Sequence, residues 1–453
     1  MGEGNKLTLT IERMAYGSDA IAHTDEGKTV FVQGAVIGDT AEVTIVDEAP
    51  NYAHAKASAI IEPSPLRVES PCPYASVCGG CPWSSLSRDA QLSAKRDNII
   101  DSLTRIGHLD TDRAEALVAD VESPSDGWGY RNKVELATEL RNGRITIGMH
   151  TQAAKGQDAT APQVIRVDSC ALLDKKHAKL VKSVSGALGY LQGSSADIEI
   201  ERVGIRASRR TKDVEIALWT KPGPFPRARV AKVLADACKP TSVVRVLTKG
   251  TAKARKVTGV EVLSGKGFWR ERIAGETMLL SAPSFFQVNT QGAERLVDLV
   301  LELADPKETD EAFDLYSGAG TFTLPLARHC DWVSAVEASG PAIRDLRRNL
   351  ESAGFDNAEP IGGDAGREFP DTEADIIVVD PPRAGLAPDV VDKLSKQPAR
   401  TIVYVSCDPA TLARDIARFE KIGTYRAEAI HPVDLFPQTY HVESVVKLTR
   451  AGL

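Results

Sequence analysis

A single cysteine stands where a buried strand is expected to give way to a helix. Cys407 follows the apolar run TIVYV at 401–405 and precedes Asp408-Pro409 and a segment of helical periodicity. The N-terminus of a helix carries a partial positive charge, which favours thiolate over thiol. A lone cysteine is more often a small buried hydrophobe. The motifs around Cys407 favour a nucleophile instead.

A glutamate lies at the entrance of the last predicted strand, in HVESVVKL at 441–448. A glutamate in a strand is by default a surface residue, but Glu443 and Cys407 together could carry out one definite reaction. C5 of uracil is too weak a nucleophile to attack a sulfonium methyl group, whereas addition of a thiolate to C6 turns the ring into an enolate that can. After methyl transfer a base must remove the C5 proton so that the thiol can leave. Glu443 is the predicted base.

The methyl donor is expected at DLYSGAG, residues 314–320, which closes a strand and opens a helix. In open parallel sheets, ligands bind at such turns, outside the carboxyl ends of the strands. Gly318 and Gly320 allow a tight turn and a close approach of the backbone to a ligand. A dinucleotide fingerprint would need glycine in place of Thr323, which disfavours nicotinamide and flavin cofactors. Ordinary turn residues of a doubly wound sheet are the competing interpretation.

Carboxylates follow three predicted strands. Glu337 ends WVSAVE, where it could accept hydrogen bonds from ribose hydroxyls, and Asp364 in GGDA could bond an adenine amino group. Asp380 opens DPPRAGL after the run DIIVV, and the prolines stop that strand. An acidic site without phosphate ligands fits a nucleoside with a positive sulfonium better than a pyrophosphate. Enzymes that methylate exocyclic amines have an aromatic residue in the place of Arg383, so amine chemistry is disfavoured.

Three of the seven cysteines crowd into CPYASVCGGC at 72–81. An odd total and this crowding favour reduced thiolates that bind a metal or do chemistry over a disulfide framework. Cys72, Cys78 and Cys81 have the spacing C-x5-C-x2-C. With a fourth cysteine they could hold zinc or an iron–sulfur cluster, and the spacing alone does not choose between them.

The chain from 271 onward supplies a framework for the catalytic residues. The short apolar runs AFDLY, WVSAV, DIIVV and TIVYV alternate with helical stretches such as PAIRDLRRNLESAG and PATLARDIARFEKIG, which have Pro near the start and Gly at the end. Strands that alternate with helices predict an open, mostly parallel sheet.

Two further regions precede this sheet, and a length of 453 residues allows two or three domains. Residues 1–64 contain the predicted strands LTLTI at 7–11, TVFVQ at 29–33 and AEVTIV at 41–46, with glycines between them, as in a small β-barrel of the oligonucleotide-binding type. Residues 85–106 show helical periodicity, and a mixed α/β region extends to about 270.

Charge is distributed unevenly along the chain. The total is −7, but residues 201–272 contain 18 Lys/Arg against 6 Asp/Glu, a net charge of +12 that leaves −19 on the remainder. Such an excess predicts a surface that binds a polyanion, here RNA phosphates, although a solvated basic face is an equal alternative. The expected phosphate-binding residues are Arg206, Arg209, Arg210, Lys249, Lys253, Arg255 and Lys256. Trp219, Phe225 and Trp269 could stack on bases, but core packing is favoured for each.

The N-terminal MGEGNKLTLT lacks a basic region followed by an apolar run. No later segment approaches the roughly 18 uninterrupted apolar residues that would cross a bilayer. We therefore expect a soluble, cytoplasmic protein without a membrane partner, and a monomer.

Taken together, FFQVN at 285–289, DLYSGAGTFTLPLA from 314, DPPRAGL, SCDP and HVES resemble, in order and spacing, the RNA 5-methyluridine (uracil-C5) methyltransferase family, in its form with a TRAM domain and an iron–sulfur cluster. The resemblance covers nearly the whole chain. It implies a multidomain fold: an OB-like TRAM β-barrel at 1–64, a mixed α/β central domain at 65–270, and a Rossmann-like class I methyltransferase domain at 271–453. The helix at 85–106 is expected to pack on the catalytic domain.

The resemblance also implies roles for individual residues. S-adenosylmethionine would be bound by Gln287, Tyr316, Glu337 and Asp380, with Thr321, Asp364, Gly318 and Gly320 beside it. Cys407 would be the nucleophile and Glu443 the base, with Asp380 as a third catalytic residue. A [4Fe–4S] cluster of structural role would be held by Cys72, Cys78, Cys81 and Cys170, with zinc as the alternative.

The target uridine would be turned out of its RNA into the crevice. Members of the family that carry the cluster favour 23S rRNA as the substrate, and the same chemistry on tRNA is the alternative. An RNA cytosine-C5 methyltransferase is a rival, but it would be expected to have a Pro-Cys pair, which DPPR lacks. A non-catalytic RNA-binding or assembly protein is the rival from another class.

Overall fold

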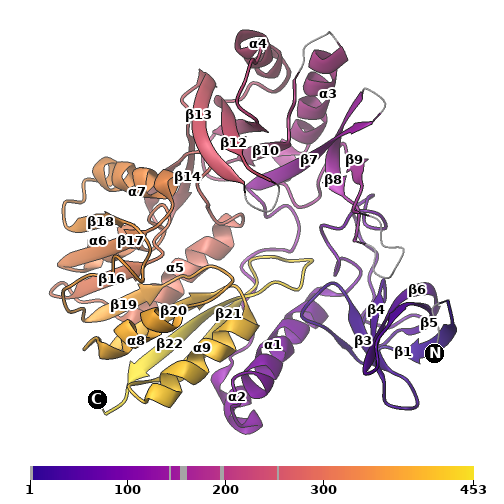
Figure 1. Ribbon diagram of the computed structural model, residues 1–453, viewed down its shortest axis with the longest axis horizontal. Helices are drawn as coiled ribbons and strands as arrows, with labels where there is room; N and C mark the ends of the chain where they lie inside the picture. The colour runs from indigo at the N-terminus through magenta and orange to yellow at the C-terminus, as the bar shows by residue number, and fades with distance from the viewer. Residues whose placement is uncertain (1–3, 142–143, 154–160, 194–197, 252–254, 453) are drawn as a thin grey trace.

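The computed structural model describes residues 4–141, 144–153, 161–193, 198–251 and 255–452. Within these residues three large β-sheets form three regions of the molecule (Figure 1). The N-terminal sheet lies at the lower right of the view, the central sheet at the top, and the C-terminal sheet at the left.

The N-terminal domain is a six-stranded sheet with its own apolar core. Its strands are β1 (Lys6–Thr10), β2 (Arg13–Met14), β3 (Ala20–His23), β4 (Thr29–Gln33), β5 (Thr40–Glu48) and β6 (Tyr52–Glu62), in the order β1-β5-β6-β4-β3-β2. Along β4 and β5, buried residues alternate with half-buried ones, as expected where one face of a strand lies on a core. The strands predicted at 7–11, 29–33 and 41–46 are confirmed as β1, β4 and β5.

The central domain is a seven-stranded sheet in the order β13-β12-β11-β10-β7-β8-β9. Its strands are β7 (Lys133–Arg141), β8 (Arg144–His150), β9 (Val164–Arg166), β10 (Arg202–Ala207), β11 (Val214–Thr220), β12 (Ser242–Lys249) and β13 (Lys256–Gly265). The short helix η1 (Lys175–His177) precedes α3 (Lys179–Gly193), and α4 (Arg227–Cys238) connects β11 to β12. Side chains of α3 and α4 pack with the sheet in one core.

The C-terminal sheet has the order β18-β17-β16-β19-β20-β22-β21. It contains β16 (Glu311–Leu315), β17 (Trp332–Glu337), β18 (Ala358–Gly362), β19 (Ile376–Val379), β20 (Thr401–Ser406), β21 (Tyr425–Val433) and β22 (Glu443–Arg450). The five strands from β18 to β20 in this order pair in parallel, and β22 is antiparallel to both β20 and β21. The predicted open, mostly parallel sheet is confirmed, and the antiparallel β22 is an addition to it.

Two helical layers cover this sheet. The core on one face takes residues from α5 (Thr290–Ala304), α6 (Thr323–His329) and α7 (Gly340–Ala353), and from the hairpin β14 (Trp269–Ile273) and β15 (Glu276–Leu280). The core on the other face takes residues from α8 (Pro388–Lys396), α9 (Pro409–Ile422), α1 (Arg88–Arg105) and α2 (Thr111–Leu117). Helices α7 and α9 have Pro in their first turn and a left-handed Gly cap, as their sequences predict.

Helix α1 therefore packs on the C-terminal sheet, although it comes before the central domain in sequence. Ile99 and Leu103 are buried in the same core as α9, and α1 lies between the N-terminal sheet and the C-terminal domain (Figure 1). Lys95, also fully buried, places its ammonium 2.5 Å from Asp434 in the loop between β21 and β22. This contact fixes the loop that leads into Glu443.

Candidate active site

A pocket of about 780 Å³ opens at the C-terminal sheet. It lies beyond the carboxyl ends of β16 and β19, whose following helices α6 and α8 cover opposite faces of the sheet. Ligands of doubly wound sheets bind at this switch point. The predicted site residues that line it are Gln287, Tyr316, Gly318, Thr321, Glu337, Asp364, Asp380, Cys407 and Glu443.

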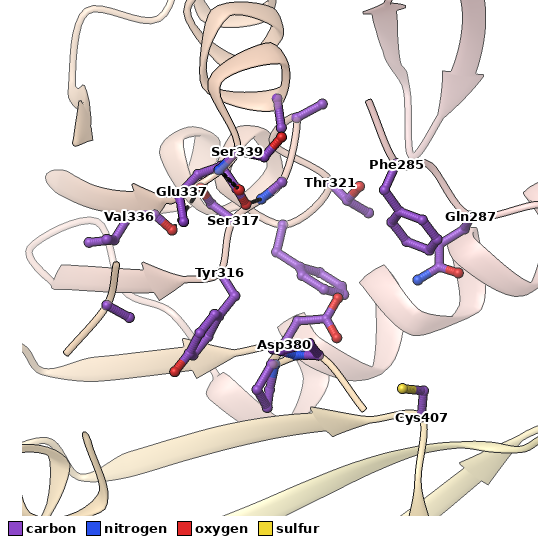
Figure 2. Close-up of a pocket in the computed structure, with 18 of the residues that line it drawn as sticks. Phe285, Gln287, Tyr316, Ser317, Thr321, Val336, Glu337, Ser339, Asp380 and Cys407 are labelled. Atoms are coloured by element: carbon purple, nitrogen blue, oxygen red, sulfur yellow. Dashed lines mark hydrogen bonds between the residues drawn. The ribbon is translucent and has the colours of Figure 1, made fainter. Parts of the chain in front are cut away.

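The two ends of the pocket differ in the residues that they present. In Figure 2, Cys407 and Gln287 lie on one side, Tyr316 and Glu337 lie on the other, and Asp380 projects between them. The predicted nucleophile and the predicted ribose-binding carboxylate thus face one cavity from opposite ends.

The loop after β16 holds the Glu337 end together. One carboxylate oxygen of Glu337 accepts a hydrogen bond from the backbone N–H of Gly318 at 2.9 Å, and the other accepts one from Ser339. Tyr316 has a φ of +66°, a left-handed conformation that costs a non-glycine residue about 1 to 3 kcal/mol and that often occurs at functional sites. The carboxylate of Glu337 therefore links the loop after β16, through Gly318, to the loop after β17, through Ser339.

The two glycines of the loop have different surroundings. Gly318 lines the pocket with a φ of +58°. Gly320 is not among the lining residues, and a Cβ there would meet Leu324 at 2.6 Å and Leu346 at 2.7 Å. The missing side chain of Gly320 thus makes room for the packing of α6 and α7, and its place beside a ligand stays a prediction.

Burial and neighbouring carboxylates raise the pKa of two acidic groups at this site, Asp314 and Asp380. Asp314 is fully buried and accepts a hydrogen bond from the Thr323 hydroxyl at 2.5 Å. Burial raises the pKa of Asp314 to about 7, and Glu337 adds to the rise. Burial also raises the pKa of Asp380 to about 7, with contributions from Asp314 and Glu337. A cation bound here would relieve this repulsion, so the carboxyl groups fit a sulfonium ligand.

The predicted thiolate stabilisation at Cys407 is not what the structure provides. Cys407 lies between β20 and α9, but the carboxylate of Asp408 caps the helix and accepts from the N–H groups of Ala410 and Thr411, both at 3.0 Å. These N–H groups at the start of α9 are therefore bonded to Asp408 and are not available to stabilise a thiolate at Cys407. Burial raises the pKa of the Cys407 thiol to about 12, and the charges of Glu443 and Asp380 contribute to the rise.

Glu443 lies beside Cys407 because of the strand register. In the antiparallel pair β20–β22, the last residue of β20, Ser406, is opposite Ser444, so Cys407, the residue after that strand, comes close to Glu443, whose charge acts on its thiol. Glu443 is 3% exposed. Burial raises its pKa well above the ordinary value, with Asp380 adding to the rise and Arg383 opposing it.

Gln287 presents an unused acceptor to the pocket. Its side-chain carbonyl oxygen is buried and has no hydrogen-bond partner within the described residues. Its backbone carbonyl accepts from the amide of Asn132 at 2.9 Å, so the central domain helps to position it. A buried acceptor without a partner is costly, and a bound ligand that donates to it would remove that cost.

The pocket residues that were not predicted as site residues include Phe285, Phe436 and His441. Phe285 is 67% exposed and lies on the Cys407 side of the pocket (Figure 2). The ring nitrogen Nε2 of His441 is 3.3 Å from the guanidinium of Arg383, and burial and that cation lower the pKa of His441 to about 4. Phe285 and His441 lie in the motifs FFQVN and HVES, yet nothing in their spacing marked them.

The four cysteines of the predicted cluster lie outside this pocket, near enough for their charges to influence one another. Burial raises the pKa of Cys81 to about 12, and the thiols of Cys170, Cys78 and Cys72 contribute to the rise. The buried guanidinium of Arg131 opposes that rise and acts in the same direction on Cys170. Among the described residues, no three His, Cys, Asp or Glu side chains form a group that could hold a metal ion.

One residue of the predicted phosphate-binding surface lies inside the protein. Arg206 is buried and donates to the carbonyls of Ser281 at 2.8 Å and Ser284 at 2.5 Å, with Glu215 at 3.6 Å. Its assignment to phosphate binding is wrong, because its guanidinium ties the central sheet to the segment that precedes FFQVN.

Other cations of the segment are also engaged within the protein. Arg210 pairs with Glu294, Arg255 lies 3.4 Å from Glu201, and Arg209 lies 3.4 Å from Asp174. Lys249 and Lys256 are exposed partners in the β12–β13 register. Lys253 lies outside the described residues.

The three candidate stacking aromatics pack inside the protein. Trp219 and Trp269 are buried, and Phe225 packs against the central core. The guanidinium of Arg202 lies 4.2 Å from the ring centroid of Trp219, and that of Arg245 lies 4.3 Å from the ring of Phe225. Core packing, the favoured interpretation of these residues, agrees with their burial.

Within the described residues, no helix has the length and apolar composition needed to span a bilayer.

Comparison with protein families gives two matches. Residues 272–451 match the model of the tRNA (uracil-5-)-methyltransferase family, and residues 2–58 match that of the TRAM domain. The first match contains the whole C-terminal sheet, and the second coincides with the N-terminal sheet.

Relatives of similar length extend the comparison over the whole chain. An RNA methyltransferase of Clostridium tetani is 34% identical over 438 residues, which cover 94% of this chain and 92% of the relative. An RNA methyltransferase of Gloeobacter violaceus is 33% identical over 470 residues, with 99% and 97% covered. The crystal structure of the Pyrococcus abyssi tRNA (uracil-54, C5)-methyltransferase in complex with S-adenosyl-L-homocysteine superposes with a TM-score of 0.73 at 27% identity, covering 98% of this chain and 100% of that one.

Proposed function

The chain belongs to the RNA methyltransferases of the uracil-5-methyltransferase family, and from that premise we propose that Cys407 and Glu443 methylate C5 of a uridine in RNA. One observation supports this assignment above all others. The β20–β22 register brings a thiol and a carboxyl group side by side at the edge of a pocket whose other end is lined by Glu337 and Asp364.

Cys407 first loses its thiol proton to solvent, and the thiolate then bonds to C6 of the uracil, which moves the C5–C6 electron pair into an enolate. When bound, S-adenosylmethionine supplies the methyl group as a sulfonium electrophile. Glu443 then accepts the proton from C5, the C5–C6 double bond re-forms, and the Cys407 thiolate leaves as the C6–S bond breaks. Burial and Asp380 raise the pKa of Glu443, so its carboxylate, once ionised, binds a proton more strongly than an ordinary glutamate does.

The remaining lining residues serve the cofactor. Glu337 and Asp364 would accept from the ribose hydroxyls and the adenine amino group, and Tyr316 and Thr321 would line the same end. Asp380 lies between the two ends of the pocket (Figure 2), where its charge would favour the sulfonium. The pKa of the Cys407 thiol would fall on binding of a sulfonium, because the positive charge would offset the two carboxylates that raise it.

Cys72, Cys78, Cys81 and Cys170 are proposed to hold a [4Fe–4S] cluster of structural role, with zinc as the alternative. The nearness of the four thiols to one another and to the guanidinium of Arg131, whose charge opposes the rise in the pKa of Cys81 and Cys170, supports this proposal. The visible spectrum and metal content of protein purified without oxygen separate the two. Brown protein with iron and sulfide is expected, and a colourless protein with one zinc contradicts the cluster.

The RNA class is the remaining part of the proposal. The resemblance to the cluster-bearing form of the family favours 23S rRNA, while the superposed Pyrococcus abyssi protein is a tRNA (uracil-54, C5)-methyltransferase. We place 23S rRNA first. Mapping of 5-methyluridine in both RNA classes, from cells with and without this protein, identifies the substrate by the site that disappears.

Transfer of labelled methyl groups from S-adenosylmethionine to RNA tests the activity. The Cys407→Ala variant should transfer none, whereas Cys238→Ala, a cysteine at the end of α4 in the central domain, should act as the unsubstituted protein does. A Cys407→Ala variant with full activity would remove the proposed mechanism.

A further inference from the structure

A tyrosine of the N-terminal domain contacts the backbone of the nucleophile. Tyr16 lies in the loop between β2 and β3, and its hydroxyl donates a hydrogen bond to the carbonyl oxygen of Cys407 at 3.2 Å. The two residues are 391 positions apart in sequence. A domain whose fold marks it for RNA binding therefore also supports the strand end that carries the thiol.

The loop that holds Tyr16 is anchored by a fully buried tryptophan. The ring N–H of Trp83 donates to the carbonyl of Gly17 at 3.1 Å. The backbone N–H of Trp83 donates to the carbonyl of Gln438, also at 3.1 Å. Trp83 thus ties the Tyr16 loop and the loop that precedes β22 to one another.

A second contact of Tyr16 leads toward the predicted base. Its ring packs edge-on against Tyr440, with ring centroids 5.4 Å apart, and Tyr440 packs on the apolar core of the N-terminal domain. The ring of Tyr440 lies 4.1 Å from that of His441, which lines the pocket two residues before Glu443. Tyr16 therefore contacts both chain segments that carry the proposed catalytic pair.

The hydroxyl of Tyr16 remains a donor at working pH. Burial raises its pKa, and the nearby Asp408 and Cys407 add to the rise. Cys407 itself belongs to neither β20 nor α9, so its peptide group is fixed by loop contacts of this kind. The orientation of that peptide determines where the sulfur points.

We propose that Tyr16 is a positioning residue of the active site, whose hydrogen bond to the Cys407 carbonyl holds the thiol toward the substrate. The N-terminal domain then contributes to the chemical step as well as to any grip on RNA. The inference rests on the proposed function of Cys407 as nucleophile.

The Tyr16→Phe variant removes the hydroxyl and keeps the ring. We compare it with Tyr190→Phe, an exposed tyrosine of α3 in the central domain, in methyl transfer to RNA at saturating concentrations of both substrates. Loss of one hydrogen bond predicts a kcat about 3- to 10-fold lower for Tyr16→Phe, with both KM values unchanged. Tyr16→Ala should lose more, because the packing on Tyr440 goes as well. Equal kcat values overturn the inference, and so does a raised KM for RNA at unchanged kcat.

A second measurement does not depend on methyl transfer. Alkylation of Cys407 by iodoacetamide, followed by mass spectrometry on the protein alone, should be about 3- to 10-fold faster in Tyr16→Phe than in Tyr190→Phe, since the strand end is released. Equal rates overturn the inference even if the unsubstituted protein methylates no RNA. In that last case the proposed function fails separately, because the methyl assay of the unsubstituted protein reports it.

Discussion

At the scale of single residues, the thiol of Cys407 is surrounded by groups that oppose its ionisation. Burial and the charges of Glu443 and Asp380 raise its pKa to about 12. Its alkylation rate in the free protein should therefore keep rising with pH beyond about 9, where an ordinary thiol with a pKa near 8.5 has begun to level off. A plateau at about pH 9 would contradict the effect of the two carboxylates.

S-adenosylmethionine should move this alkylation profile to lower pH, because its sulfonium stabilises the thiolate. S-adenosylhomocysteine, which is neutral at sulfur, is the control and should move the profile less. Equal shifts with the two ligands would mean that the charge of the cofactor has no influence on the thiol.

Glu443 should be needed to complete the reaction but not to begin it. Glu443→Gln keeps the shape of the side chain and removes the base, so turnover should fall about 10²- to 10⁴-fold. RNA should then accumulate as a covalent adduct that migrates slowly in a denaturing gel. The control is Glu428→Gln, an exposed residue of β21 whose carboxylate pairs with Lys447. Full turnover in Glu443→Gln would show that another group takes the proton.

The sequence predicted most of the pocket-lining residues because each of them ends a strand or follows one. Asp408 before Pro409 is a typical N-cap sequence, so the cap of α9 was predictable, but the interpretation of Cys407 did not take it into account. The reaction predicted for Cys407 and Glu443 required them to be neighbours, but the contact itself depends on the register of an antiparallel pair, which the sequence does not show. Gly320 was assigned to the ligand because sequence spacing does not show which way a missing Cβ would point.

At the scale of elements, helix α1 supports the loop that leads into β22. Lys95 and Asp434 form a fully buried ion pair, and Arg88 also contacts this carboxylate. Gln91 and Gln438 add two hydrogen bonds. The side-chain amide N–H of Gln91 donates to the side-chain oxygen of Gln438 at 3.0 Å, and the backbone N–H of Gln438 donates to the side-chain oxygen of Gln91 at 2.9 Å. A helix that precedes the central domain in sequence thus fixes residues close to Glu443.

The Lys95→Met variant should destabilise the protein by about 3 kcal/mol, because it leaves the buried Asp434 without one of its cations. Chemical unfolding measures the loss. The control is Lys232→Met on α4, whose ion pair with Asp236 is exposed and which should change stability by less than about 1 kcal/mol. Equal effects in the two variants would show that α1 does not stabilise the loop through this ion pair.

In the C-terminal half, the spacing of apolar residues and the positions of Pro and Gly all indicate the same elements, so its helices and parallel strands were predictable. Strands β2, β3 and β6 were not predicted. β2 is only two residues long, and most residues of β6 after the first four are exposed. Helix α1 could be placed on the catalytic domain only through resemblance, because its apolar face does not specify its partner.

At the scale of the whole molecule, local charge in the sequence was a poor guide to the RNA surface. Arg206 lies inside the protein, and Arg210 and Arg255 pair with acidic residues that are distant in sequence. Such pairing depends on the tertiary fold and cannot be inferred from the number of charges in a segment. The exposed cations Lys249 and Lys256 remain from the predicted set.

Replacing Lys249 and Lys256 together by alanine should therefore weaken RNA binding and reduce the slope of log affinity against log salt by about 1 to 2. Arg210→Ala is the control, since its guanidinium already pairs with Glu294, and it should leave the slope nearly unchanged. If the double variant keeps the original slope, RNA phosphates bind elsewhere.

Covalent trapping tests the central claim most directly. RNA that contains 5-fluorouridine at the target site, offered together with S-adenosylmethionine, can accept the thiolate at C6 and the methyl group at C5 but has no C5 proton for Glu443 to remove. The account predicts a stable protein–RNA adduct, with the bond mapped to Cys407 and no adduct in Cys407→Ala. Absence of an adduct, or an adduct that persists in Cys407→Ala, would contradict it.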